Sequence, residues 1–283
     1  MPNSPADNLP ANSLQRPHPM WVWPLHISAK LSWRLLRIAD RASRLFDHRW
    51  WPVLCLIIGA IPAGVSFLLC VRFANELTAV LAVPVILGAV RRDLTWRGWF
   101  ALVLIVVGHC GVNITLAAWY PERLSVILPQ GLRYWQESRA WIETGINSEY
   151  ELRSWIPAHL QLAAGLLPLA YLSWGLIPVA AGFEQCDMMN FYVGRLIAES
   201  SNPWVAGGLG WHPWSLCRGI GAVFLILEMT SWSVERFTGE RLSSTARRRQ
   251  RWVWGVTFLA VDALMKATLT EHVRQILAAG LHS

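Results

Sequence analysis

Four ionisable side chains interrupt the last two apolar segments of the chain, at about 216–234 and 253–270. They are Arg218, Glu228, Asp262 and Lys266. A charge near the centre of a bilayer costs about 2.5 to 3.5 kcal/mol on insertion scales, so such residues call for a partner or a function. Asp262 precedes Lys266 by one helical turn, the favourable order for an ion pair. If the two segments form an antiparallel hairpin, all four residues could join one network. That network would either conduct ions or protons, or only neutralise its own charges.

His109 and Asn113 lie one helical turn apart in the apolar sequence GHCGVN. This spacing is similar to that found in rhomboid proteases and in the CPBP family of intramembrane proteases. A rhomboid also needs a Gly-x-Ser-Gly nucleophile, and the chain contains no Ser-Gly dipeptide. The paired-glutamate motif of the CPBP family is missing as well. We therefore expect His109 and Asn113 to form a polar contact between helices. An intramembrane enzyme that uses His109 and Glu228 is the alternative.

A third group of polar and aromatic residues follows the apolar stretch that ends near residue 183. It comprises Asp187, Asn190, Trp211, His212 and Trp214. These side chains could form a recognition patch at the membrane surface. They could equally be interfacial anchors and helix caps, with Asp187 as an N-cap.

Motifs of known chemistry are missing from the sequence. It has no P-loop, dinucleotide fingerprint, zinc-protease helix or EF-hand spacing. The five cysteines are widely spaced and form no CxxC pair, which argues against a zinc site or a disulfide framework. We predict neither a metal nor a cofactor.

The elements that position these residues are apolar segments. Hydrophobic residues make up 54% of the chain and charged residues 15%, well below the roughly 25% of soluble domains. Segments 52–71, 98–119 and 160–183 are long enough to cross a bilayer. Segment 77–90 is shorter and crosses only if its helix extends back through Asn75 and Glu76; otherwise it is re-entrant. With the two charged segments, this predicts an all-α polytopic transmembrane bundle of five or six spans over 51–283.

Three segments are predicted to lie outside the bilayer. Residues 1–19 are rich in Pro, Asn and Ser and are expected to be a disordered tail. Residues 20–50 should form a basic amphipathic helix on the membrane surface, or one that docks on the protein's own loops. Residues 121–158 carry five glutamates and four arginines and are expected to form a polar cap.

The basic residues of the N-terminal helix predict a lipid partner rather than a nucleic acid. They recur along the helix beside apolar residues, at Lys30, Arg34, Arg37, Arg41 and Arg44. A net charge of +7 alone would also suit nucleic-acid binding. Arginines next to apolar runs are instead typical of orientation signals and of contacts with anionic lipid headgroups.

The charge of the loops conflicts with the count of spans. Loop 235–252 holds six arginines and two glutamates and should face the cytoplasm, as should the basic N-terminal helix. If all six segments cross, however, the loop and the helix lie on opposite sides. One assumption must therefore fail, either at the short segment 77–90 or through an uncounted re-entrant stretch between 190 and 213.

These observations predict a multi-pass integral membrane protein, which we place in a bacterial cytoplasmic membrane. The leading interpretation is a non-catalytic scaffold or assembly subunit with other membrane proteins as partners. It rests on the missing catalytic motifs, the amphipathic surface segments and the 18 tryptophans. The alternatives are a transporter or channel that uses the four buried charges, and an intramembrane enzyme.

Overall fold

The computed structural model describes residues 29–146 and 152–282, and every regular element in these ranges is a helix. This confirms the all-α prediction. The expected tail at 1–19 lies outside the described residues. Six helices are long and apolar enough to cross a membrane. They are α2 (Trp51–Leu69), α3 (Ala74–Arg91), α4 (Thr95–Trp119), α7 (Leu152–Leu172), α10 (Pro213–Thr238) and α11 (Thr245–His282). The short segment at 77–90 thus belongs to a full-length helix that does begin before Asn75.

The expected span 160–183 is wrong, because the chain reverses direction inside it. Helix α7 ends at Leu172 and α8 (Leu176–Glu199) begins after a tight turn. Trp174 and Gly175 adopt positive φ angles of 55° and 83° in this turn. Glycine takes such a conformation without steric cost, which ends the first helix here. The sequence stays apolar through the turn, so hydropathy alone showed one segment.

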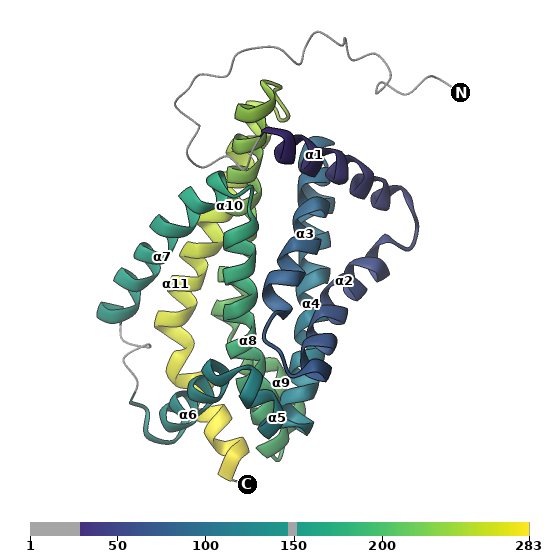
Figure 1. The fold of residues 1–283 in the computed structure, drawn as a ribbon. Helices are drawn as coiled ribbons and strands as arrows, with labels where there is room; N and C mark the ends of the chain where they lie inside the picture. Colours follow the sequence, from purple (N-terminus) through teal and green to yellow (C-terminus); the bar gives the residue numbers. More distant parts are fainter. Residues whose placement is uncertain (1–28, 147–151, 283) are drawn as a thin grey trace.

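Helix α8 runs through the bundle from end to end, although it is too polar to be counted among the six apolar helices. At its beginning, Trp174 packs against Phe237 near the end of α10, with ring centroids 5.2 Å apart. At its end, Glu199 accepts a hydrogen bond from Arg139 of α6 (Pro129–Thr144), at 2.8 Å. Figure 1 shows α8 beside the long helices. This additional passage explains the conflict between loop charge and the count of spans.

One end of the molecule gathers the arginine-rich segments, and we call it the basic end. It comprises α1 (Ala29–Ser43), the short 3-10 helix Arg44–Asp47, the α3–α4 turn and the α10–α11 turn. The segments are joined by the pairs Arg91–Asp40, Arg92–Asp47, Arg247–Asp93 and Ser243–Asp93. The hydrogen bond from Arg92 lowers the pKa of Asp47. The N-terminal helix and the loop at 235–252 therefore lie on the same side, as their charge predicted.

Helix α1 lies across the basic end and packs on the protein itself (Figure 1). Its buried residues Leu36 and Ala39 face α3, where a Cβ at Gly88 would lie 2.6 Å from the carbonyl oxygen of Ala39. Ile38 of the same helix is 50% exposed. The basic side chains that the structure describes in this helix region are exposed: Arg34, Arg37, Arg41 and Arg44. The helix thus docks on its own bundle and still presents a basic face.

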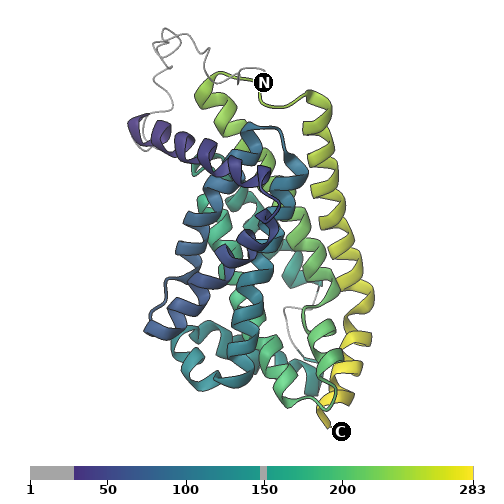
Figure 2. The same ribbon diagram turned by 90° about the vertical axis from the view of Figure 1, so that its right-hand side faces the viewer.

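The opposite end is built from short helices. These are α5 (Pro121–Ile127), α6 and α9 (Pro203–Gly210), together with the end of α11. Figure 2 shows them gathered at the end where the C-terminus lies. Ser201 donates a backbone hydrogen bond to Gly280 at 3.0 Å, and Arg274 donates to the carbonyl of Ile142 at 2.9 Å. The polar cap expected at 121–158 is shorter than predicted, because α7 already begins at Leu152.

Candidate functional site

A buried cluster of polar side chains joins α4 to α8 near the middle of both helices. Asp187 Oδ1 lies 2.7 Å from His109 Nε2 and accepts a hydrogen bond from Asn113 Nδ2 at 2.6 Å. Thr78 Oγ1 of α3 lies 3.5 Å from the other ring nitrogen of His109. We call Thr78, His109, Asn113 and Asp187 the α4–α8 cluster. The expected helix-to-helix contact of His109 and Asn113 is present, and its partner is an aspartate.

Close helix packing fixes the position of this cluster. Glycines let the backbones of α2 and α4 touch, since a Cβ at Gly59 would collide with the carbonyl of Ile105 and one at Gly108 with that of Leu56. On α8, a Cβ at Gly194 would lie 2.5 Å from the carbonyl of Ile114. Small residues allow such approach between membrane helices. His109 on α4 is consequently enclosed between Thr78 of α3 and Asp187 of α8.

The α4–α8 cluster is sealed from solvent. His109 and Thr78 are 0% exposed, Asn113 and Asp187 3%. The ring of Phe183 covers His109, with centroids 4.8 Å apart. Asp187 Oδ2 and both polar side-chain atoms of Asn190 have no hydrogen-bond partner in the described part of the chain. A carboxylate beside an imidazole can hold a proton, whereas hydrolysis would also need a nucleophile and access for water.

The predicted grouping of Asp187 and Asn190 with Trp211, His212 and Trp214 is not what the structure shows. Asp187 and Asn190 are buried in the bundle, on the face of α8 that meets α4. His212 and Trp214 are each 1% exposed and stack on one another, with centroids 4.8 Å apart. Trp211 packs against the same core. These aromatic residues anchor α9 and α10 in the core and do not form an exposed patch.

Arg218 and Asp262 form a bidentate ion pair between α10 and α11. Arg218 Nε and Nη2 each donate to Asp262 at 3.1 Å. Lys266 lies one turn farther along α11, where its Nζ is 5.2 Å from the ring centroid of Trp155 on α7. The hairpin of the last two segments therefore does bring Arg218 to the level of Asp262 and Lys266. This cluster connects three helices near the capped end.

Glu228 does not belong to that cluster but faces the basic end. It is 0% exposed and accepts hydrogen bonds from Arg248 at 2.9 Å and from Arg251 at 2.6 Å. Arg248 also donates to Glu235 at 2.8 Å. Neither arginine is predicted as a partner from the sequence, because both belong to the loop whose charge indicates only the orientation of the chain. Arg248 and Arg251 lie three positions apart, which places them on one face of a helix. This spacing could have indicated a common partner.

The four ionisable residues thus divide into two separate ion-pair groups, and neither contacts the α4–α8 cluster in any described hydrogen bond. Among the described residues, no group of three or more His, Cys, Asp or Glu side chains is arranged to hold a metal ion. No protein-family model, curated protein or solved structure matches the chain.

Proposed function

We propose that the protein is a non-catalytic membrane subunit that assembles with another membrane protein along α7 and α8. The observation that carries this proposal is the poor burial of α7. In its most apolar stretch, only 11% of the residues are buried inside the protein, against 67% in α3. Helix α7 packs on α10 and α8 on one side and leaves the rest of its surface free for lipid or a partner.

Glycines on these two helices support a protein partner rather than lipid alone. Gly165 on α7 and Gly182 on α8 are exposed, and no atom lies within 4 Å of a Cβ built at either position. Each lies seven or eight residues from the turn between the helices, which corresponds to about 11 Å along the axis of its helix. Elsewhere in the bundle, Gly59 and Gly108 bring helices into contact. The same residue type is available here for a helix from another chain.

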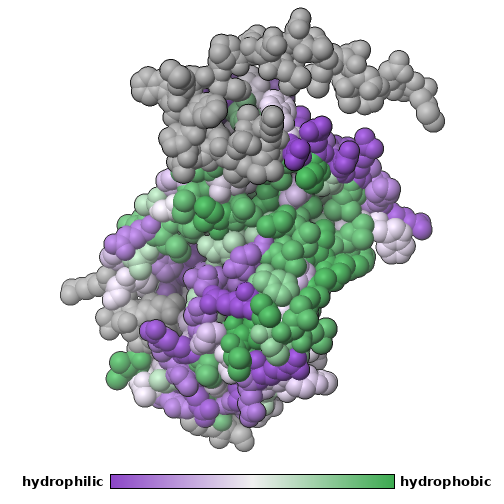
Figure 3. All heavy atoms as spheres, viewed as in Figure 1, coloured by the Kyte–Doolittle hydropathy of each residue, from purple (hydrophilic) through white to green (hydrophobic). Residues whose placement is uncertain are grey.

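The surface near these helices is also unusually polar for a lipid-facing surface. Figure 3 shows hydrophilic side chains at mid-height between α7 and α2, beside the apolar surface of α2. Arg72 and Glu184 form an ion pair at 2.6 Å, with side chains 40% and 46% exposed. Polar side chains that face hydrocarbon are costly, and a partner's polar groups would satisfy them.

The ion pairs in the last two long helices support a structural role over transport. The Glu228 and Asp262 side chains are 0% and 4% exposed, and each is paired with arginine. An intramembrane enzyme is less well supported, because it requires His109 and Glu228 in one pocket. His109 binds Asp187, whereas Glu228 binds Arg248 and Arg251.

Transport is the second candidate function, and one observation favours it. Asp187 Oδ2 and the Asn190 amide are buried and have no hydrogen-bond partner among the described residues, so a water molecule could bind there, as a proton pathway requires. In proteoliposomes with a pH-sensitive dye inside, transport predicts a proton flux that Asp187→Asn abolishes. Equal flux from the native protein and from Asp187→Asn would exclude this candidate.

For orientation, we infer that the basic end faces the cytoplasm, in a bacterial cytoplasmic membrane. The six arginines at 235–252 support this side, because the segment at 121–158 carries only four arginines. On that side, the exposed Arg34, Arg37, Arg41 and Arg44 of the N-terminal region would meet anionic lipid headgroups; the side chain of Lys30 lies outside the described part of the structure.

The assembly proposal is tested by affinity purification in mild detergent followed by mass spectrometry. We expect Gly165→Leu to lose a partner that the native chain retains, because the added side chain blocks close approach. Gly111→Leu is the matched control, since Gly111 is also an exposed helical glycine with no atom near its Cβ position. Loss of the partner from both variants, or from neither, would contradict the proposal.

A further inference from the structure

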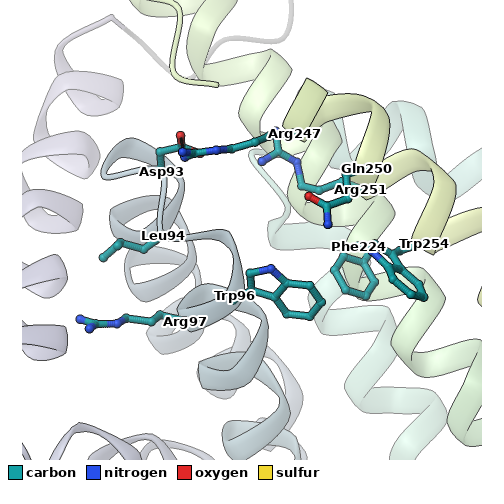
Figure 4. A pocket seen from close by; sticks show the side chains of 9 residues that line it. All are labelled: Asp93, Leu94, Trp96, Arg97, Phe224, Arg247, Gln250, Arg251 and Trp254. Carbon is teal, nitrogen blue, oxygen red and sulfur yellow. Dashed lines mark hydrogen bonds and ion pairs between the residues drawn. The ribbon is translucent and has the colours of Figure 1, made fainter. Parts of the chain in front are cut away.

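A pocket of about 270 Å³ lies at the basic end, between the beginnings of α4 and α11. Figure 4 shows its lining residues. They are Asp93, Leu94, Trp96, Arg97, Phe224, Arg247, Gln250, Arg251 and Trp254. Helix α10 forms the floor through Phe224, which is 2% exposed. The pocket contributes to neither of the two functions proposed above, and it is independent of them.

The lining divides into an aromatic part and a polar part. Trp96 meets the ring of Phe224 edge-on, with centroids 5.6 Å apart, and Trp254 is 39% exposed beside them. In Figure 4, the side chains of Arg247, Gln250 and Arg251 lie above these three rings and form the polar part. A ligand that fills the pocket must therefore have a polar part and an apolar part.

The arginines of the pocket differ in their availability. Arg251 is 4% exposed and is bound by Glu228. Arg97 points away from the aromatic rings (Figure 4) and donates to the carbonyl of Phe46 at 3.2 Å. Arg247 is 56% exposed and pairs with Asp93, and Gln250 is exposed next to it. Arg247 and Gln250 are thus the donors that an incoming anion can reach, and Asp93 is its competitor for Arg247.

The pocket lies where the surface of α11 changes from basic to apolar. Arg247, Arg248 and Arg249 lie on the basic side of this change, and the exposed Val253 and Val256 lie on the apolar side. Tryptophan is enriched at this level in membrane proteins, where headgroups meet hydrocarbon. Near the aromatic part, Trp99 stacks on Phe224 at 5.9 Å, and its Nε1 is a buried donor without an acceptor in the described residues.

We propose that this pocket binds the headgroup of one anionic phospholipid. Its phosphate contacts Arg247 and Gln250, and its hydrocarbon begins along Trp96 and Trp254. Guanidinium groups bind phosphate by charge-assisted hydrogen bonds. The volume is slightly below the roughly 300 Å³ of the smallest typical ligand pockets, so it suits a headgroup whose acyl chains remain in the bilayer.

Native mass spectrometry of the protein with added lipid tests the proposal. We expect phosphatidylglycerol to be retained at least about fivefold better than phosphatidylcholine, and Arg247→Gln to remove this preference. Arg249→Gln is the matched control, because Arg249 carries the same charge on the same helical turn, is exposed and does not line the pocket. Equal retention of the two lipids, or equal loss in both variants, would overturn the proposal.

A second variant separates lipid binding from a purely structural ion pair. Asp93→Asn removes the competitor of the phosphate, and asparagine tolerates the positive φ of 53° at this position. We expect this variant to retain more phosphatidylglycerol, whereas a structural role of the Arg247–Asp93 pair predicts less.

Competition with glycerol 3-phosphate, at the same concentration as the lipid, distinguishes a lipid headgroup from a soluble phosphate as the ligand. If it displaces the lipid completely, the pocket is a site for a soluble phosphate and the proposal fails.

Discussion

Asp187 on α8 and His109 on α4 lie 2.7 Å apart in the centre of the bundle, although 78 positions separate them in the sequence. Asn113 donates to the same carboxylate oxygen. This contact connects α8, which is not among the six apolar helices, with α4, which is one of the most apolar helices of the protein. It explains how α8 keeps an aspartate inside the bundle.

Removal of the carboxylate from the α4–α8 cluster should destabilise the protein. Asp187→Ala leaves His109 and Asn113 buried without their common acceptor, at a cost of about 1 to 3 kcal/mol. Unfolding by titration with sodium dodecyl sulfate in mixed micelles measures this change. Gln185→Ala is the control, because Gln185 is exposed on the same helix. If Asn113→Ala adds its full effect to Asp187→Ala, the two side chains are not coupled.

Glu228 should be needed because its arginine partners are buried. Glu228→Leu leaves Arg251, which is 4% exposed, without its carboxylate, and we expect a loss of about 3 to 5 kcal/mol in the free energy of unfolding. The double variant Glu228→Leu, Arg251→Leu should regain most of that loss, since no buried charge then remains from the pair. A double variant as unstable as Glu228→Leu would contradict this reasoning. The same detergent titration provides the comparison.

His212 should make stability depend on pH. Burial, with the nearby charges of Lys266 and Arg218, lowers the pKa of His212 to about 3 in the folded protein. An unfolded histidine has a pKa of about 6.5, so between these values the unfolded state binds the additional proton. The free energy of unfolding should therefore be highest above pH 6.5 and fall as the pH decreases towards 3. We expect a loss above about 1.4 kcal/mol, the equivalent of one pKa unit.

His212→Asn should reduce this pH dependence, because asparagine does not titrate and accepts the positive φ of 48° found here. His48→Asn, at an exposed position, is the matched control for the substitution itself. Thermal unfolding at several pH values compares the three proteins. An identical decline in His212→Asn and in the native chain would exclude His212 as its source.

The orientation of the bundle predicts which residues are accessible from each side of the membrane. In a chain without its native cysteines, Ser244→Cys at the basic end should react with an impermeant maleimide only from the cytoplasmic side. Gln136→Cys on α6 should react only from the other side. Between Gln136 and Ser244 the chain passes along the bundle three times, in α7, α8 and α10, so the two positions lie at opposite ends. Both positions are exposed. Labelling of both from one side would contradict the passage of α8 through the bundle.

The sequence by itself determined the class of the protein and most of its membrane helices. Long uncharged runs such as 52–71 must bury their backbone groups in helices within lipid, and this requirement is local. The basic periodicity around Arg34 and Arg41 is local as well, and a helix lies there. Hydropathy averages over a window, however. It could not detect the reversal at Trp174 and Gly175, because both flanking helices are apolar at that end.

Only the tertiary structure decided which polar residues are partners. Asp187 and Glu228 each find their partners on another helix, and such pairing depends on the rotation and level of both helices, which no local pattern contains. The same holds for α8, which crosses the bundle despite its polarity because His109, Asn113 and Arg72 bind its acidic residues. The face of α8 that carries Asp187 is buried against α4 and does not meet lipid, so the hydropathy of α8 does not reveal its position.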